Sequence, residues 1–235
     1  MAYEIRTETI QQDIAKVQQA FLTKVYGWMS VGLLITTLFS FFTLNSEILL
    51  NLIFSTRWGI WVLLLSELGL VMYLSARIES LKAETATMLF LLYSTLNGIT
   101  LAPIFLVYTG ESIVQTFVVC SGMFAAISIY GFVTKKDLNS FGSYLSMGLI
   151  GIILASVINM FLGSENLNWA ITIIGIIIFT GLAAYNTQKM KAMSYVMLEG
   201  GSVAQKGAII GALVLYLNFI NLFLMLLRVL GDRRR

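Results

Sequence analysis

The sequence has no histidine, one cysteine and one proline, and only 11% of its 235 residues are charged. Without histidine, metal sites and catalytic triads lose their commonest ligand and general base. The single Cys120 excludes an intramolecular disulfide and leaves the redox compartment open. Gly200-Gly201-Ser202 follows no expected strand, so it is not a phosphate-binding loop. We therefore predict that the protein is not an enzyme and has no cofactor or metal centre.

The shortage of charge accompanies an excess of apolar residues, which make up 58% of the chain and give a mean hydropathy of +0.85. Soluble domains carry roughly 25% charged residues. No apolar-polar alternation typical of a membrane β-barrel is present. We predict an all-α integral membrane protein whose main partner is the lipid bilayer. The net charge of +3 comes from loop lysines and arginines and indicates membrane orientation rather than nucleic-acid binding.

Seven apolar stretches each have about 18–23 residues, the length that crosses a ~30 Å hydrocarbon core. They predict spans at 25–44, 59–76, 87–108, 113–133, 144–162, 169–188 and 208–230. Pro103 interrupts the third span and frees the carbonyl of Ile99, which we interpret as a kink.

The spans divide the chain into a polar N-terminal arm (1–21), a seven-helix membrane domain (22–231) and a basic C-terminal tail (232–235). The arm is either a short interfacial helix, because Ile10, Ile14, Val17 and Phe21 recur at helical spacing, or an ordinary polar tail.

Lysine and arginine in the loops set the orientation, because these residues concentrate on the cytoplasmic side. Only Arg57 falls in the loops opposite the arm, whereas ten basic residues share its side. These ten are Arg6, Lys16, Lys24, Arg77, Lys82, Lys135, Lys136, Lys189, Lys191 and Lys206. The N-terminus is therefore expected in the cytoplasm. Seven crossings place Arg228 and the tail outside, against the same rule, whereas a re-entrant last segment would keep the tail inside. We predict seven crossings.

The last apolar stretch carries Tyr216, Asn218 and Asn221 near its middle. An amide that faces hydrocarbon costs free energy unless it finds a partner. Asn218 and Asn221 are three residues apart and so share one helix face. These features predict a seven-transmembrane-helix bundle with the last helix central.

Glu67 is the only acidic residue deep inside a predicted span. Such residues usually face a bundle interior or a wet cavity, so Glu67 either lines an ion path or is a structural hydrogen-bonding carboxyl. Arg77 lies ~15 Å further along the same helix, where it is either part of the path or a cytoplasmic anchor. Asn186, Asn218 and Asn221 extend this polar track, although such amides can also merely join helices.

Five segments resemble the Bax inhibitor (transmembrane Bax inhibitor motif) family, in its bacterial branch. They are KVYGWMSVGLL from Lys24, LYSTLNGITLAPIFLVYT from Leu92, SIYGFVTKKDL from Ser128, FTGLAAYNTQKMK from Phe179 and ALVLYLNFINLFLMLLRVLG from Ala212. The resemblance implies a bacterial inner-membrane protein whose last helix is surrounded by the other six, and a pH-sensitive Ca²⁺ leak.

The resemblance also implies two aspartates that share a proton, in YDTQ and YLDFINLF, with a basic residue and a path-lining glutamate in the second helix. Here Asn186 and Asn218 occupy the proton-sensor positions, Glu67 matches the glutamate, and Arg77 matches the basic position to within about one residue. Two coupled carboxyls titrate but two amides do not. We expect a Ca²⁺ leak channel with weakened pH sensing. The alternative is a non-conducting protein that modulates a membrane-bound ATP-dependent protease, as some bacterial relatives are thought to do, with the arm as its contact.

Overall fold

The computed structural model describes the backbone of residues 2–56 and 58–234, and the side chains of these residues except 2–11 and 52. Arg57 and the side chain of Arg6, both used in the charge count, lie outside the described residues. The same holds for Arg235 of the expected basic tail.

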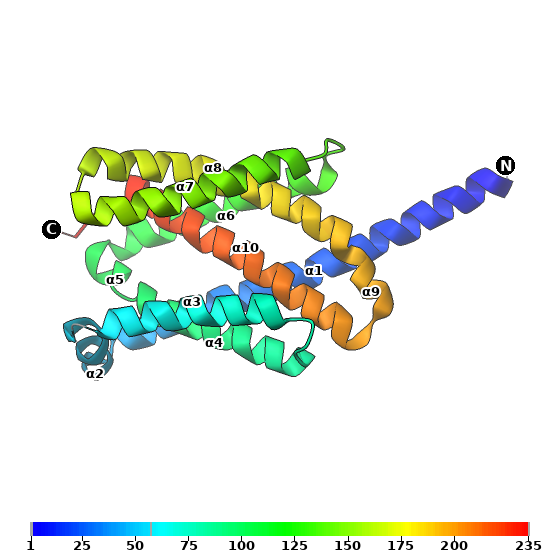
Figure 1. Cartoon of the computed structure of the whole chain (residues 1–235). Coiled ribbons are helices and arrows are strands. Elements are labelled where there is room, and N and C mark those ends of the chain that lie inside the picture. Colours follow the sequence, from blue (N-terminus) through cyan, green and yellow to red (C-terminus); the bar gives the residue numbers. More distant parts are fainter. Residues whose placement is uncertain (1, 57, 235) are drawn as a thin grey trace. The chain divides into compact units, whose positions relative to one another are not determined.

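Seven helices in this part of the chain are long and apolar enough to cross a membrane, which confirms the all-α membrane prediction (Figure 1). They are α1 (Ala2–Leu44), α3 (Gly59–Arg77), α4 (Ala83–Leu101) continued by α5 (Ile104–Val107), α6 (Gly110–Val133), α7 (Asn139–Leu162), α8 (Glu165–Ala192) and α10 (Gly201–Leu230). Four short elements complete the fold: α2 (Glu47–Leu50), a π-helix η1 (Asn51–Ser55), a 3-10 helix η2 (Met193–Tyr195) and α9 (Val196–Glu199).

The polar N-terminal arm is helical and continues without a break into the first span, as α1 in Figure 1 shows. Phe21 and Val25 are fully buried, whereas Ile14 is half exposed. The arm is thus the first part of a helix of 43 residues, longer than a bilayer requires.

The expected interruption of the third span is confirmed. α4 ends at Leu101 and the helix resumes at Ile104. Pro103 has no N–H for the carbonyl of Ile99, and that oxygen instead accepts a hydrogen bond from the N–H of Ala102 at 3.2 Å.

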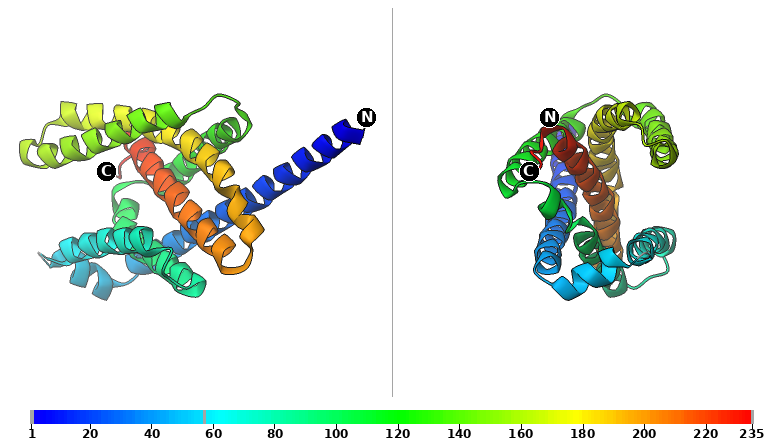
Figure 2. Two further views of the ribbon diagram at one scale, coloured as in Figure 1. Left: turned by 45° about the vertical axis from the view of Figure 1, so that its right-hand side comes forward. Right: turned by 90° about the vertical axis from the view of Figure 1, so that its left-hand side faces the viewer.

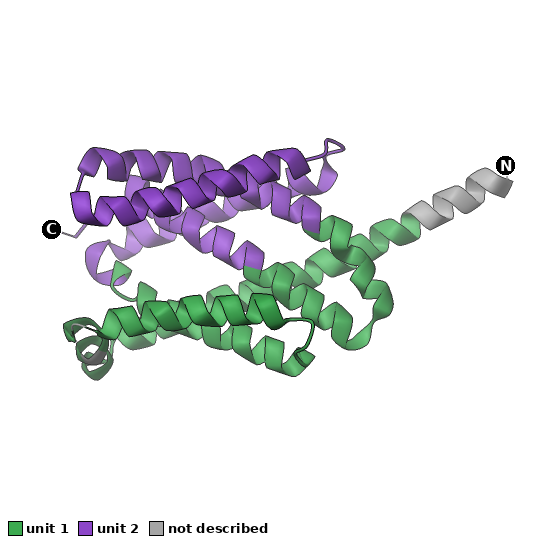
Figure 3. Ribbon diagram, viewed as in Figure 1, with its two compact units in different colours: residues 1–104, 190–213 green, residues 105–189, 214–235 purple. Residues whose placement is uncertain are grey.

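The chain forms two compact units, coloured separately in Figure 3. Unit 1 comprises residues 1–104 and 190–213, and unit 2 comprises residues 105–189 and 214–235. The first boundary falls beside the break at Pro103.

Within unit 1, α1 and α4 approach closely because Gly98 has no side chain. A Cβ built on Gly98 would lie 2.5 Å from the carbonyl oxygen of Thr36. Two hydroxyls of α1 use this proximity: Ser40 Oγ donates to the carbonyl of Gly98 at 2.6 Å, and Thr36 Oγ1 donates to that of Ser94 at 2.9 Å. These bonds fix the register of α1 on α4.

Within unit 2, α7 and α8 lie side by side in both views of Figure 2. A Cβ on Gly142 of α7 would overlap the ring of Tyr185 of α8, and one on Gly131 of α6 would meet the carbonyl oxygen of Ala184 at 2.3 Å. Small residues therefore let α6 pack directly on the backbone of α8 and let α7 accommodate the ring of Tyr185.

α10 is the most buried of the seven candidate spans. Its most apolar stretch is 67% buried, against 11–44% for the other six. This agrees with the argument that its polar residues avoid lipid. That the other six helices surround α10 stays a prediction.

The C-terminal tail is bound to the connection between α5 and α6, all within unit 2. The N–H of Thr109 donates to the carbonyl of Asp232 at 3.0 Å, and the N–H of Arg234 donates to that of Val107 at 2.8 Å. Seven crossings place both segments on the same side of the membrane. A re-entrant last segment would place them on opposite sides, so these bonds support seven crossings.

Candidate functional site

Glu67 lies on the one buried stripe of α3. Glu67 and Leu74 are the two buried residues of this helix, while neighbours such as Leu65 and Leu68 are exposed. The two buried positions are seven residues apart and therefore share one face. The carboxyl is only 8% exposed, so it is directed into unit 1 and away from lipid.

Two polar residues of α4 hold this carboxyl, and a third residue of α4 binds one of them. Asn97 Nδ2 donates to Glu67 Oε2 at 3.2 Å, and the Thr100 hydroxyl donates to Glu67 Oε1. Asn97 Nδ2 also donates to the phenol oxygen of Tyr93 at 3.2 Å. We call these four residues, Glu67, Tyr93, Asn97 and Thr100, the Glu67 cluster.

Glu67 is predictable from the sequence, but its partners are less conspicuous. Tyr93, Asn97 and Thr100 follow the i, i+4, i+7 spacing that places side chains on one face of a helix. All three lie in the predicted third span, and none is charged. Only this helical spacing in the sequence could have indicated that the three residues line one face beside Glu67.

The Glu67 cluster offers oxygen atoms in a buried place without a basic side chain among its four members. Carboxylate, amide, hydroxyl and phenol oxygens are the ligand types that hard cations such as Ca²⁺ prefer. Asn97 Oδ1 is buried and has no hydrogen-bond partner among the described residues. The described part of the chain has no group of three or more His, Cys, Asp or Glu that could hold a metal ion. The cluster therefore gathers oxygen types that hard cations bind, with Glu67 as its one acidic side chain.

Arg77 does not belong to this cluster. It is the last residue of α3, is exposed, and lies ten positions beyond Glu67, ~15 Å along the helix axis. This location fits an anchor at the membrane surface. Its role in an ion path stays a prediction.

Asn186 on α8 and Asn218 on α10 are both buried, at 9% and 6% exposure, and both belong to unit 2. Asn218 Nδ2 has no hydrogen-bond partner among the described residues. A buried donor without an acceptor costs free energy, so burial of the Asn218 amide is not fully compensated by hydrogen bonds.

Asn221 differs from Asn218 despite the shared face. It is half-buried, and its Nδ2 donates to the carbonyl of Leu217 on its own helix at 2.8 Å. Its amide therefore needs no partner on another helix. The structure places Glu67 and Arg77 in unit 1 and Asn186, Asn218 and Asn221 in unit 2. The polar track through all five stays a prediction.

Arg228, near the end of α10, is accommodated by neutral acceptors of α8. Its Nη1 donates to Asn168 Oδ1 at 2.7 Å and to Thr172 Oγ1 at 3.2 Å. Asn168 and Thr172 are four residues apart, one turn of helix, so one guanidinium nitrogen reaches both. From the sequence, Arg228 was expected only as an exception to the charge rule, and its partners on α8 were not predicted.

Comparison with known proteins gives consistent matches along nearly the whole chain. The family described as "Inhibitor of apoptosis-promoting Bax1" matches residues 18–235. The "Inner membrane protein YbhL" of Escherichia coli (strain K12) is 51% identical over 230 residues, which are 97% of this chain and 98% of that protein. An "Uncharacterized protein" of Borreliella burgdorferi is 45% identical over 218 residues, covering 93% of this chain and 94% of its own length.

Proposed function

The chain belongs to the Bax inhibitor family, and from this membership we propose that it is a cation leak channel of a bacterial inner membrane, with Ca²⁺ as the transported ion. The main support is the Glu67 cluster, a buried carboxyl whose partners are all neutral oxygen- or nitrogen-bearing side chains. The name of the Escherichia coli relative supports the location. The distribution of lysine and arginine supports a cytoplasmic N-terminus.

The hydrogen bonds of the Glu67 cluster occupy both carboxylate oxygens and so leave neither of them open to a cation. Both oxygens of Glu67 accept hydrogen bonds, from Asn97 and from Thr100, so an entering cation has to displace at least one donor. A hydroxyl can rotate its proton away and present a lone pair. Thr100 can therefore change from donor to ligand without leaving its place. Such oxygen atoms replace the water that a cation sheds on entry.

Weakened pH sensing follows from Asn186 and Asn218 at the sensor positions. An amide resembles a protonated carboxyl in shape and hydrogen bonding, but it carries no charge at any ordinary pH. Ca²⁺ flux is therefore expected to change little between about pH 6 and pH 8, because the coupled carboxyl pair is replaced. Restoring Asp at both positions should restore a pH response. A wild-type response as steep as that of the double variant would contradict this part of the proposal.

The path role of Glu67 is tested by Ca²⁺ flux into liposomes that contain purified protein. Glu67→Gln removes the charge and should lower the flux by about tenfold or more, because the path then lacks its only carboxylate. Thr100→Val removes one hydroxyl and should also change the flux. The matched control is Thr95→Val, since the Thr95 hydroxyl donates to the carbonyl of Leu91 on its own helix at 3.0 Å. Wild-type flux in Glu67→Gln would exclude the path role.

The alternative function is modulation of a membrane-bound ATP-dependent protease without conduction. The long polar start of α1 supports it, because this helix extends well before the predicted span. Deleting residues 1–20 should leave the flux of a channel intact but abolish modulation of a protease. The absence of flux in every variant, with loss of protease modulation on deletion, would favour this alternative.

A further inference from the structure

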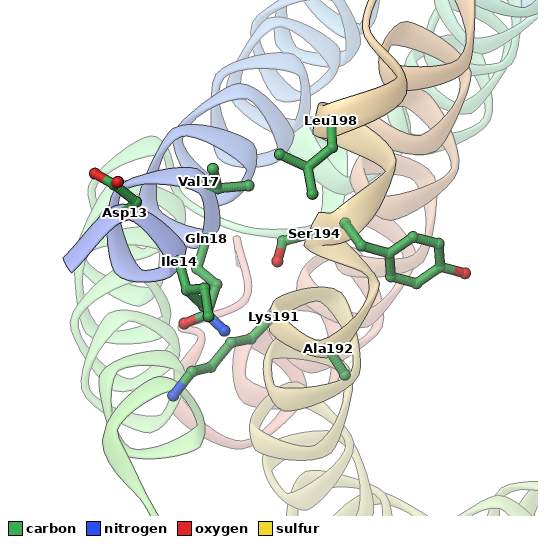
Figure 4. A pocket seen from close by; sticks show the side chains of 9 residues that line it. Asp13, Ile14, Val17, Gln18, Lys191, Ala192, Ser194 and Leu198 are labelled. Carbon is green, nitrogen blue, oxygen red and sulfur yellow. The ribbon is translucent and has the colours of Figure 1, made fainter. Parts of the chain in front are cut away.

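A pocket of about 370 Å³ lies between the polar part of α1 and the segment that follows α8 (Figure 4). Its apolar wall comes from Ile14, Val17 and Leu198, and its polar side from Gln18, Lys191 and Ser194. All of these residues belong to unit 1. Figure 4 shows Val17 and Leu198 facing each other at one end and Lys191 beside Gln18 and Ile14 at the other.

The pocket lies near the predicted membrane surface. Gln18 precedes the start of the first predicted span by about seven residues, ~10 Å along a helix, and Lys191 follows the end of the sixth by about three, ~5 Å. These depths correspond to the headgroup layer next to the hydrocarbon core. The pocket is therefore reached from the bilayer interface.

Large apolar side chains at the rim indicate that the pocket faces lipid headgroups rather than bulk water. Leu198 is 75% exposed, Tyr195 is 58% exposed, and Ile14 is also exposed. Tyrosine is enriched at membrane interfaces, where its ring is buried and its hydroxyl stays wet. These residues would cover the upper part of an acyl chain.

The charge of the pocket favours an anionic group. Lys191 lines it directly, and the cytoplasmic leaflet of bacterial membranes offers anionic phospholipids to basic residues. One acidic residue, Asp13, also lines the pocket, but its carboxylate is 3.5 Å from the amine of Lys16. The hydroxyl of the buried Ser194 and the amide of Gln18 add hydrogen-bond donors that a phosphate can use.

We propose that this pocket binds the headgroup of an anionic phospholipid of the cytoplasmic leaflet, with its phosphate at Lys191 and the start of an acyl chain along Val17 and Leu198. The inference rests on the proposed cytoplasmic orientation of the N-terminus and not on ion conduction. A protein without Ca²⁺ flux can therefore still bind the lipid, and a conducting protein can lack it.

The test is retention of phosphatidylglycerol by the purified full chain, compared with phosphatidylcholine, by native mass spectrometry from mixed micelles. Lys191→Gln should weaken retention of phosphatidylglycerol by about fivefold, the equivalent of the ~1 kcal/mol that one basic residue contributes near an anionic surface. The matched control is Lys135→Gln, an exposed basic residue of the expected cytoplasmic loop that does not line the pocket. The control should retain the lipid as the wild type does.

A second variant, Val17→Trp, fills the pocket without changing its charge and should also reduce retention. Equal losses in Lys191→Gln and Lys135→Gln would overturn the proposal, because the effect would then be general surface charge. Equal retention of the two lipids by the wild type would overturn it as well. A photoreactive side chain at Ile14 that captures a protein in cells instead of lipid would assign the pocket to a protein partner and refute the proposal.

Discussion

Replacing Asn97 and Asn218 by leucine should change the stability of the folded protein in opposite directions. The two residues are similarly buried, at 8% and 6% exposure, and leucine has the branching pattern of asparagine with two methyl groups in place of the amide oxygen and nitrogen. Their hydrogen bonds differ. Asn97 Nδ2 donates to Glu67 and to Tyr93, whereas Asn218 Nδ2 has no partner among the described residues. Comparing the two variants therefore separates the free-energy cost of burying an amide from the stabilisation that its hydrogen bonds provide.

The expected magnitudes follow from these contacts. Asn218→Leu removes a buried donor that has no acceptor, and such a group costs about 1–3 kcal/mol. We expect this variant to be more stable by about 1 kcal/mol, at the low end of that range. Asn97→Leu loses two hydrogen bonds worth roughly 0.6 kcal/mol each in a membrane protein and leaves Glu67 Oε2 without its donor. Because Asn97 Oδ1 is itself unpartnered, the net loss should be about 1–3 kcal/mol.

Reversible unfolding in mixed micelles, followed by the fluorescence of the four tryptophans, measures both variants against the wild type. The two unfolding midpoints should move in opposite directions from that of the wild type. If Asn218→Leu is destabilised as much as Asn97→Leu, the amide of Asn218 has an acceptor in the folded protein and the reasoning fails. Stabilisation of Asn218→Leu would also indicate that this amide is kept for a reason other than stability.

Three further predictions use other parts of the chain. Gly98→Val should destabilise the protein by about 1–3 kcal/mol, since its side chain would meet the backbone of α1. In the control Gly27→Ala a Cβ meets nothing within 4 Å, and alanine favours a helix more than glycine does, so this variant should unfold at the temperature of the wild type or slightly above it. Alkaline phosphatase fused after Arg235 should be active and a fluorescent protein fused there dark; the reverse result would refute seven crossings from a cytoplasmic N-terminus. Cys120, which is fully buried, should react with a maleimide only after unfolding, and rapid labelling of the native protein would contradict its placement.

The sequence predicted where helices end more accurately than where they begin. The expected ends at Leu44, Leu162 and Leu230 agree with α1, α7 and α10. α7, however, begins at Asn139 rather than near residue 144, and α10 begins at Gly201 rather than near residue 208. Hydropathy reports which part of a helix is in hydrocarbon, and a helix continues through polar residues as long as its backbone bonds are made.

The candidate site was predictable only in part for a similar reason. Glu67 is conspicuous because a charge inside a span is rare, whereas Asn97 and Thr100 are ordinary polar residues until their contacts are known. For Asn221 the sequence predicts more than the structure shows. Its sequence position indicates a need for a partner on another helix, but the carbonyl of Leu217 on its own helix supplies the acceptor.

Because α1 is one unbroken helix, it connects the N-terminal residues to the surroundings of the Glu67 cluster. A helix of 43 residues is ~64 Å long, about twice the ~30 Å of a hydrocarbon core. Ser40, near the other end, holds the carbonyl of Gly98, whose neighbour Asn97 binds Glu67. Between Ser40 and the carboxyl there are therefore only three links, two hydrogen bonds and one peptide linkage, so a displacement of α1 reaches Glu67 directly.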